Sequence, residues 1–104
     1  MTAVARSLAV SVMPLENRRE QFLMLATLGE RLGYDALLLP ETWAYDVTIV
    51  LAEAALKTER LRVGSAILGV WNRSAATLAM GAATLASLSA GRFILGLGAS
   101  TRTG

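Results

Sequence analysis

The chain is 104 residues long, with 54% hydrophobic residues, 17% charged residues, a net charge of +2, and neither cysteine nor histidine. This length allows one domain, and the missing residue types exclude a disulfide framework and the usual ligands of zinc and copper, so no metal is expected. The ten basic residues form no run along the chain, which argues against a nucleic-acid partner.

The apolar excess bears on the surroundings of the protein. So few charges cover a domain of this size poorly, which indicates that much of the surface is buried against a partner or that part of the protein is missing. The apolar stretch 75–90 is shorter than the ~20 residues of a membrane span. The first residues lack the cleavage pattern of a signal peptide. We therefore expect a soluble, cytoplasmic protein with no membrane partner.

Four short apolar runs alternate with three longer segments of helical character. The runs cover about 7–13, 35–40, 61–68 and 92–98. They start about every 30 residues, which is the length of one βα unit. Their nearly continuous apolarity is typical of parallel strands that are buried on both faces. The sequence predicts one partial α/β domain over 1–104, with the order βαβαβαβ.

The first helix is expected between the first two runs. Asn17 is suited to cap it while the side chain of Glu20 reaches back, as in a capping box. Gly33 stands where a left-handed C-terminal cap is favoured. The helical period also predicts one buried apolar face, made of Phe22, Leu25, Gly29 and Leu32.

The second and third helices have their own end signals. Asp46 and Ser74 are suited to cap their N-termini, and Gly91 repeats the role of Gly33 before the last strand. The third helix is dominated by alanine, glycine and serine, which let another element approach closely. It either lies flat on the sheet or forms a subunit interface. We expect a homodimer that uses the second and third helices.

The last run ends in Gly96-Leu-Gly98, which resembles the start of a phosphate-binding loop. That fingerprint must open a helix and be followed by an acidic residue ~20 positions on, but only six residues follow Gly98. The alternative is a buried strand. Two folds begin with such a βα alternation, the doubly wound sheet and the (β/α)8 TIM barrel, and the failed loop argues only against a self-sufficient nucleotide site.

Two stretches resemble a known family. They are GYDALLLPE at 33–41 and TERLRVGSAILGVWNRSAATLAMGAATLASLSAGRFILGLGAS at 58–100. Both are similar to the N-terminal half of the luciferase-like monooxygenases, a superfamily of (β/α)8 barrels, so the resemblance implies an α/β chain that forms the first half of a TIM barrel. The resemblance implies a flavin- or deazaflavin-dependent oxidoreductase or monooxygenase that binds FMN or coenzyme F-420 at the carboxyl ends of the strands. It implies hydride transfer or oxygen activation on a small-molecule substrate. It also implies that this chain is a truncated part of the domain.

The resemblance also assigns site residues at the strand ends. Cofactor contacts fall on Ala66, Ile67, Leu68, Gly98 and Ser100, and a non-proline cis peptide bond falls between Ala66 and Ile67. The alternative for this stretch is an ordinary strand that contains a glycine.

Other side chains near these strand ends are candidates for catalysis and for substrate binding. Glu41 follows a strand, where barrel enzymes place polar chemistry, so it is our candidate catalytic residue; the alternative is a carboxylate paired with Arg73 or Arg62. Trp43 and Trp71 are candidates to line a substrate pocket, with core packing as the alternative. Many members of the family carry a histidine where this chain has Thr42 and Trp43, so that chemistry is not transferred.

A second functional hypothesis belongs to a different class. A half-barrel is also able to act as a non-catalytic binding or assembly module that dimerises by pairing its exposed sheet edges with a second copy. A flavodoxin-like nucleotide binder is a third hypothesis.

Overall fold

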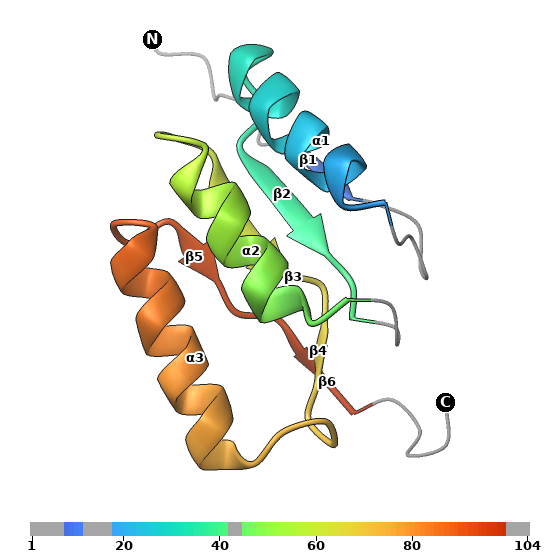
Figure 1. Ribbon diagram of the computed structural model, residues 1–104, viewed down its shortest axis with the longest axis vertical. Coiled ribbons are helices and arrows are strands. Elements are labelled where there is room, and N and C mark those ends of the chain that lie inside the picture. Colours follow the sequence, from blue (N-terminus) through green and yellow to red (C-terminus); the bar gives the residue numbers. More distant parts are fainter. Residues whose placement is uncertain (1–7, 12–17, 42–44, 100–104) are drawn as a thin grey trace, which may run out of the picture.

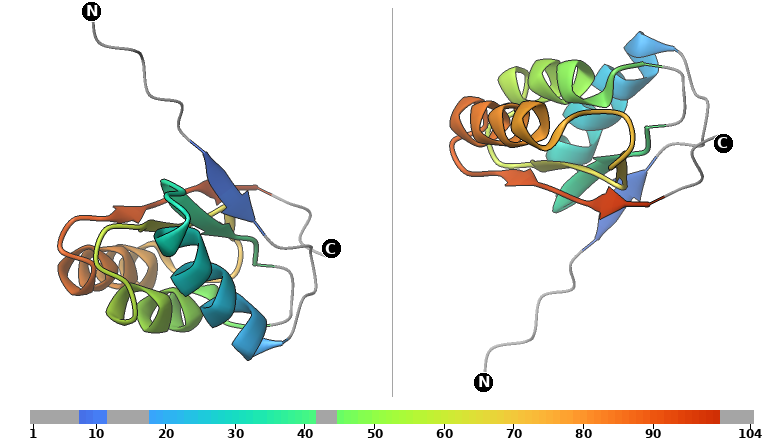
Figure 2. Two further views of the ribbon diagram at one scale, coloured as in Figure 1. Left: turned by 90° about the horizontal axis from the view of Figure 1, so that it is seen from above. Right: turned by 90° about the horizontal axis from the view of Figure 1, so that it is seen from below.

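The computed structural model describes residues 8–11, 18–41 and 45–99. Strands and helices alternate along the chain. Their bounds are β1 (Ala9–Ser11), α1 (Arg19–Arg31), β2 (Ala36–Leu39), α2 (Val47–Leu56), β3 (Arg62–Ser65), β4 (Leu68–Gly69), α3 (Ala75–Leu88), β5 (Phe93–Ile94) and β6 (Leu97–Gly98). The main sheet is parallel, with the strand order β1-β2-β3-β5. All three helices lie on one face of it (Figures 1 and 2).

The predicted α/β alternation is confirmed, but two of the four predicted strands are interrupted. The run 61–68 is divided into β3 and β4, and the run 92–98 into β5 and β6. The second members of each run pair with one another as a separate two-stranded parallel sheet. A continuous apolar run therefore spans two strands in each case, because apolar residues continue through the interruption.

The core lies between the sheet and the helices. Successive side chains of a strand point to opposite faces, and the helix-facing set is buried together with the inner faces of α1 and α2. Its fully buried large members are Leu37, Leu39, Leu51, Leu61, Val63 and Leu68. On the other face, a Cβ added at Gly64 would meet the side chains of Leu38 and Ile94, and no helix of the described chain covers that face (Figure 2). In a (β/α)8 barrel the helices cover only the outer face of the strands. A sheet with helices on one face is therefore consistent with one part of a barrel wall.

Most of the predicted helix ends are confirmed. Asp46 accepts a hydrogen bond from the Thr48 amide at 3.0 Å, and Ser74 accepts one from the Thr77 amide at 3.1 Å. Gly33 and Gly91 have φ values of +85° and +84°, in the left-handed region that glycine adopts without cost.

The predicted N-terminal cap and buried face of the first helix need correction. Arg18 occupies the N-cap position of α1, and its side chain makes no capping hydrogen bond. The predicted cap Asn17 precedes this position and lies outside the described residues. Leu32 is 64% exposed. At about 100° per residue it stands roughly 80° away from Phe22 around the helix axis. Ala26, which is closer to Phe22 in angle, is buried instead.

Two charged side chains tie the elements together at the amino ends of the strands. The Glu30 carboxylate accepts hydrogen bonds from the backbone amides of Glu59, Arg60 and Leu61 at 2.9, 2.5 and 2.8 Å. Arg92 stands directly before β5, and its guanidinium reaches the loop that leads into β3. These contacts fix the loop between α2 and β3, so this end of the sheet is held by polar contacts in addition to the core.

Candidate functional site

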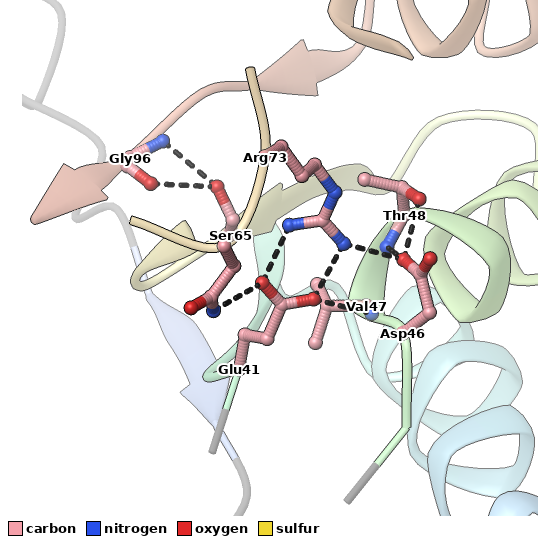
Figure 3. A network of polar contacts seen from close by, with 8 residues as sticks. Glu41, Asp46, Val47, Thr48, Ser65, Arg73 and Gly96 are labelled. Atoms are coloured by element: carbon pink, nitrogen blue, oxygen red, sulfur yellow. Dashed lines mark hydrogen bonds and ion pairs between the residues drawn. The ribbon is translucent and has the colours of Figure 1, made fainter. Parts of the chain in front are cut away.

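Polar side chains gather at the carboxyl ends of the strands. Glu41 follows β2, Asp46 stands at the start of α2, and Arg73 lies between β4 and α3. In a parallel sheet these strand ends meet at one edge, where barrel enzymes bind their ligands. Figure 3 shows the three side chains pointing toward one another.

Glu41 and Arg73 form a two-pronged ion pair. The Arg73 Nη1 and Nη2 atoms lie 2.5 and 2.6 Å from the two carboxylate oxygens of Glu41. The side chains are only 7% and 12% exposed. The Glu41 carboxylate accepts two further hydrogen bonds, from Asn72 Nδ2 at 3.1 Å and from the Val47 amide at 3.2 Å. The pairing of Glu41 with Arg73, one of the two alternatives for this residue, is confirmed.

Arg73 also reaches the start of α2. Its Nη2 donates to Asp46 Oδ1 at 2.6 Å, and the same oxygen accepts the hydroxyl and amide hydrogens of Thr48 at 2.6 and 3.0 Å. The arginine therefore joins the end of β2 to the first turn of α2. Both ends of the intervening segment, Glu41 and Asp46, are bound to one guanidinium (Figure 3).

The protonation states follow from these contacts. Burial raises the pKa of the Glu41 carboxyl, but the hydrogen bonds from Arg73, Asn72 and Val47 outweigh it and hold the pKa below its ordinary value. The hydrogen bond to Glu41 raises the pKa of Arg73. Both groups are charged at neutral pH, and each carboxylate oxygen already accepts two hydrogen bonds. A role of Glu41 in proton transfer stays a prediction.

The predicted cofactor residues of the third strand lie in the segment between β3 and β4 and at the start of β4. The Ala66–Ile67 peptide bond is cis, at the position that the resemblance implied. Backbone hydrogen bonds join the segment to both neighbours: the Ala66 amide donates to Leu39 O at 2.9 Å, and the Leu68 amide donates to Gly96 O at 2.8 Å. The segment is therefore held as a bridge between β2 and the stretch that joins β5 to β6.

The predicted cofactor-binding residues differ in how far their side chains are exposed. Ala66 is exposed and Ile67 is 38% exposed. Leu68 is 1% exposed and belongs to the core, so its side chain is not available to a ligand at this edge. A Cβ at Gly98 would overlap the side chain of Ile67, which places these two residues in contact. The structure therefore brings Ile67 and Gly98 together as one small surface.

Of three further predicted residues, one lies in the part of the chain that the structure describes. Trp71 is exposed in the loop after β4. Trp43 and Ser100 lie outside the described residues. The prediction of a substrate pocket lined by Trp43 and Trp71 is therefore untested.

Sequence reasoning missed two polar residues of this edge. Asn72 supports Glu41, and the Ser65 hydroxyl hydrogen-bonds the backbone of Gly96. The signal for Ser65 was available: it is a hydroxyl inside an apolar run, and buried polar groups are almost always hydrogen-bonded. Asn72 carried no such signal, because its partner comes from a segment 31 residues away.

Replacement of Gly96 by alanine is expected to destabilise this edge. The added Cβ would overlap the backbone oxygen of Ser65, and backbone does not move aside as a flexible side chain does. We expect Gly96→Ala to lower the free energy of unfolding by about 1–3 kcal/mol, measured by urea unfolding. Gly29→Ala is the control, because its Cβ would make only ordinary contacts at 3.8 Å. An equal loss in both variants would contradict the close approach at Gly96.

The fold and the site together define a class of protein. Parallel βα units whose polar residues gather at the carboxyl ends of the strands are the architecture of a (β/α)8 barrel, and this chain has the fold of part of one. The family model described as luciferase-like monooxygenase matches residues 3–103. The chain belongs to the luciferase-like monooxygenase family.

Individual relatives agree with this assignment. A Mycobacterium tuberculosis protein assigned by name to the coenzyme F-420-dependent oxidoreductases is 37% identical over 87 residues, which are 84% of this chain and 24% of that protein. The coenzyme F-420-dependent tetrahydromethanopterin reductase of Methanopyrus kandleri superposes with a TM-score of 0.84 at 24% identity, over 93% of this chain and 28% of the other. This chain therefore spans about a quarter of the length of these relatives.

A third relative extends the fold match to an enzyme that holds a flavin. The oxygenating constituent of 3,6-diketocamphane monooxygenase from Pseudomonas putida, solved in complex with FMN, superposes with a TM-score of 0.84 at 20% identity, over 93% of this chain and 30% of the other.

In the part of this chain that the structure describes, no helix is long and apolar enough to span a membrane.

Proposed function

We propose that this chain supplies part of the cofactor site of an FMN- or F-420-dependent oxidoreductase or monooxygenase that acts on a small molecule in the cytoplasm. The observation that carries the proposal is the surface formed by Ala66, Ile67 and Gly98 at the carboxyl ends of the strands. The family supports the reaction type, and the named relatives include an F-420 enzyme and an FMN complex. Because the chain spans about a quarter of its relatives, further βα units are expected to complete the barrel.

The residues of this surface fit a flat ring. Ala66 and Gly98 are small, and the exposed part of Ile67 offers an apolar support between them. Main-chain bonds on both sides hold the segment, so its shape does not depend on the ligand. When bound, the flavin or deazaflavin supplies the hydride or oxygen chemistry, and this chain orients the ring and excludes water from one side of it.

The charged residues of the edge have a separate task. Arg73 donates to two carboxylates, so its charge is balanced within the chain rather than directed at a phosphate. We propose that Glu41 and Arg73 hold the end of β2 and the start of α2 in place beside the cofactor. In this proposal the phosphate of the cofactor is bound by later barrel loops, in line with the general rule for this fold.

Cofactor titration of the purified chain tests the proposal. We expect FMN or F-420 to bind the purified chain measurably, but more weakly than a complete barrel would, because the phosphate contacts of the later loops are missing; quenching of the cofactor fluorescence measures the Kd. Gly98→Ala would displace the Ile67 side chain and is expected to weaken binding about tenfold, since one misplaced contact of roughly 1.4 kcal/mol changes Kd by that factor. Gly29→Ala, which lies in α1, is the matched control and should bind as the unaltered chain does. Absence of binding by the unaltered chain would contradict the proposal for this chain.

The second candidate function is a non-catalytic assembly module. Two observations favour it: the helices cover only one face of the main sheet (Figure 2), and α2 and α3 leave exposed apolar side chains between them. These side chains include Ile49 and Met80, beside the small residues Ala52 and Gly81, and they line one groove. A homodimer through α2 and α3 would bury this groove. Light scattering on the titrated sample separates the candidates, since a dimer without cofactor binding favours the module.

A further inference from the structure

The runs β3–β4 and β5–β6 lie side by side and are interrupted at neighbouring positions. Gly64 pairs with Ile94 before the interruption, and Leu68 pairs with Leu97 after it. The residues 65–67 on one strand therefore face only 95–96 on the other. This unequal count is a bulge, and a bulge leaves backbone groups without their ladder partners.

The side chain of Ser65 replaces the missing partners. Its hydroxyl donates to Gly96 O at 2.9 Å and accepts from Gly96 N at 3.0 Å. Both backbone groups of Gly96 are thus bonded to one oxygen atom, and Ser65 itself is only 3% exposed (Figure 3). Gly96 O also accepts the Leu68 amide at 2.8 Å. The hydroxyl therefore lies at the junction that fixes both interrupted strands.

The geometry of the exposed surface depends on this junction. The segment between β3 and β4 begins directly after Ser65, and its Ile67 contacts Gly98, two residues beyond Gly96. Loss of the hydroxyl would leave the Gly96 amide without that partner and the Gly96 carbonyl oxygen with the Leu68 amide alone. A backbone amide without a partner is costly, so we expect the two strands to shift relative to each other.

We propose that Ser65 is a positioning residue of the cofactor site. Its hydroxyl fixes the position of the Ala66–Leu68 backbone relative to β6. With only 3% of Ser65 exposed, its side chain acts through the backbone of Gly96 rather than through a ligand contact. The inference rests on the proposed function for the identity of the ligand, whereas the hydrogen bonds of Ser65 to Gly96 stand independently of it.

A pair of serine variants separates positioning from general stability. Ser89 is also fully buried, and its hydroxyl likewise joins two backbone groups, Ala86 O at 3.3 Å and Arg92 N at 3.1 Å, at the opposite end of the sheet. Ser65→Ala and Ser89→Ala should therefore lower the urea midpoint by similar amounts. Only Ser65→Ala is expected to weaken FMN or F-420 binding, by about tenfold, in fluorescence titrations at a urea concentration of zero.

Amide hydrogen exchange of the ligand-free chain provides a second readout. Ser65→Ala is expected to speed exchange at Gly96 and Leu68 about tenfold more than at Val63, whose amide bonds to Arg92 O at 3.0 Å. Equal changes in the two serine variants, in binding or in exchange, would overturn the proposal. If the unaltered chain binds neither cofactor, the proposed function of this chain fails, and the exchange pattern alone decides the role of Ser65.

Discussion

Replacement of Arg73 by methionine is expected to lower the free energy of unfolding by about 3–5 kcal/mol, because it leaves a buried carboxylate without its counter-charge. The Glu41 side chain is 7% exposed and receives two of its hydrogen bonds from Arg73. Asp46 would lose its ion pair to the same guanidinium. Urea unfolding at pH 7, followed by circular dichroism, measures the loss.

The free energy of unfolding should depend on pH in the opposite direction in the Arg73→Met variant. In the unaltered chain the pKa of Glu41 is lowered, so the stability it contributes is present above the unfolded pKa of about 4.3 and is lost as the pH falls below it. Without Arg73, burial would raise the pKa of Glu41 above that value. The Arg73→Met variant should then become more stable as the pH is lowered from 7 toward 5, and stability that falls over this range would contradict the assignment.

A double variant is the control for this prediction. Replacement of both partners of a buried ion pair by apolar residues costs much less than removal of one. We therefore expect Glu41→Met with Arg73→Met to recover more than half of the loss, even though two further donors to Glu41, Asn72 and the Val47 amide, lose their acceptor. A double variant that is no more stable than Arg73→Met alone would mean that packing, not charge, dominates at this pair.

Replacement of Arg92 by methionine is expected to cost about 3 kcal/mol or more. An arginine has five N–H donors, and all five are bonded here. Nε donates to Ser89 O, Nη1 to the Thr58 hydroxyl and Leu61 O, and Nη2 to Ala55 O and Thr58 O, at 2.6–3.1 Å. Loss of the guanidinium leaves several carbonyl groups near the ends of α2 and α3 without their partner, at about 1–3 kcal/mol for each that stays buried.

Lysine at the same position provides a graded test. It keeps the charge but has only three donors on a single nitrogen, so Arg92→Lys should lose roughly half of what Arg92→Met loses. Arg62→Met is the control, since Arg62 is exposed on β3. Urea unfolding ranks Arg92→Met, Arg92→Lys and Arg62→Met by their free energies of unfolding. If Arg92→Lys is as stable as the unaltered chain, the charge alone stabilises this position and the number of donors does not.

Much of the fold was predictable because local signals agreed with the tertiary structure. The four apolar runs mark the strands, and Asp46, Ser74, Gly33 and Gly91 mark the helix ends through rules that depend only on nearby backbone. The N-terminus of α1 was the exception. A capping box at Asn17 was equally compatible with local chemistry, but the helix starts after Arg18.

The interruptions of the strands were not predictable from periodicity. Leu68 and Leu97 continue the apolar runs after the bulge as they would in an unbroken strand. The difference arises from the count of residues on two strands that are about 30 positions apart, and hydrophobic pattern carries no information on that count. The resemblance assigned Leu68 to the cofactor site, but it carried no information on the direction of the side chain, which lies in the core.

The site was predictable in part. The position of Glu41 after a strand indicated a polar contact at the mouth, and Arg73 was one of its two expected partners. The resemblance supplied the Ala66–Ile67 bond, which strand propensities would have passed over. Asn72 was missed because its partner is near only in the tertiary structure. Ser65 was missed although a hydroxyl inside an apolar run signals a hydrogen bond, because the sequence does not say which backbone group is its partner.

Polar contacts hold both ends of the sheet, with Arg73 at one end and Glu30 and Arg92 at the other. The contacts of Arg73 and Arg92 share no residue. Changes at independent sites usually add in free energy. The carboxyl-end loops of this protein can therefore diverge in sequence while the opposite end retains the stability that such changes consume.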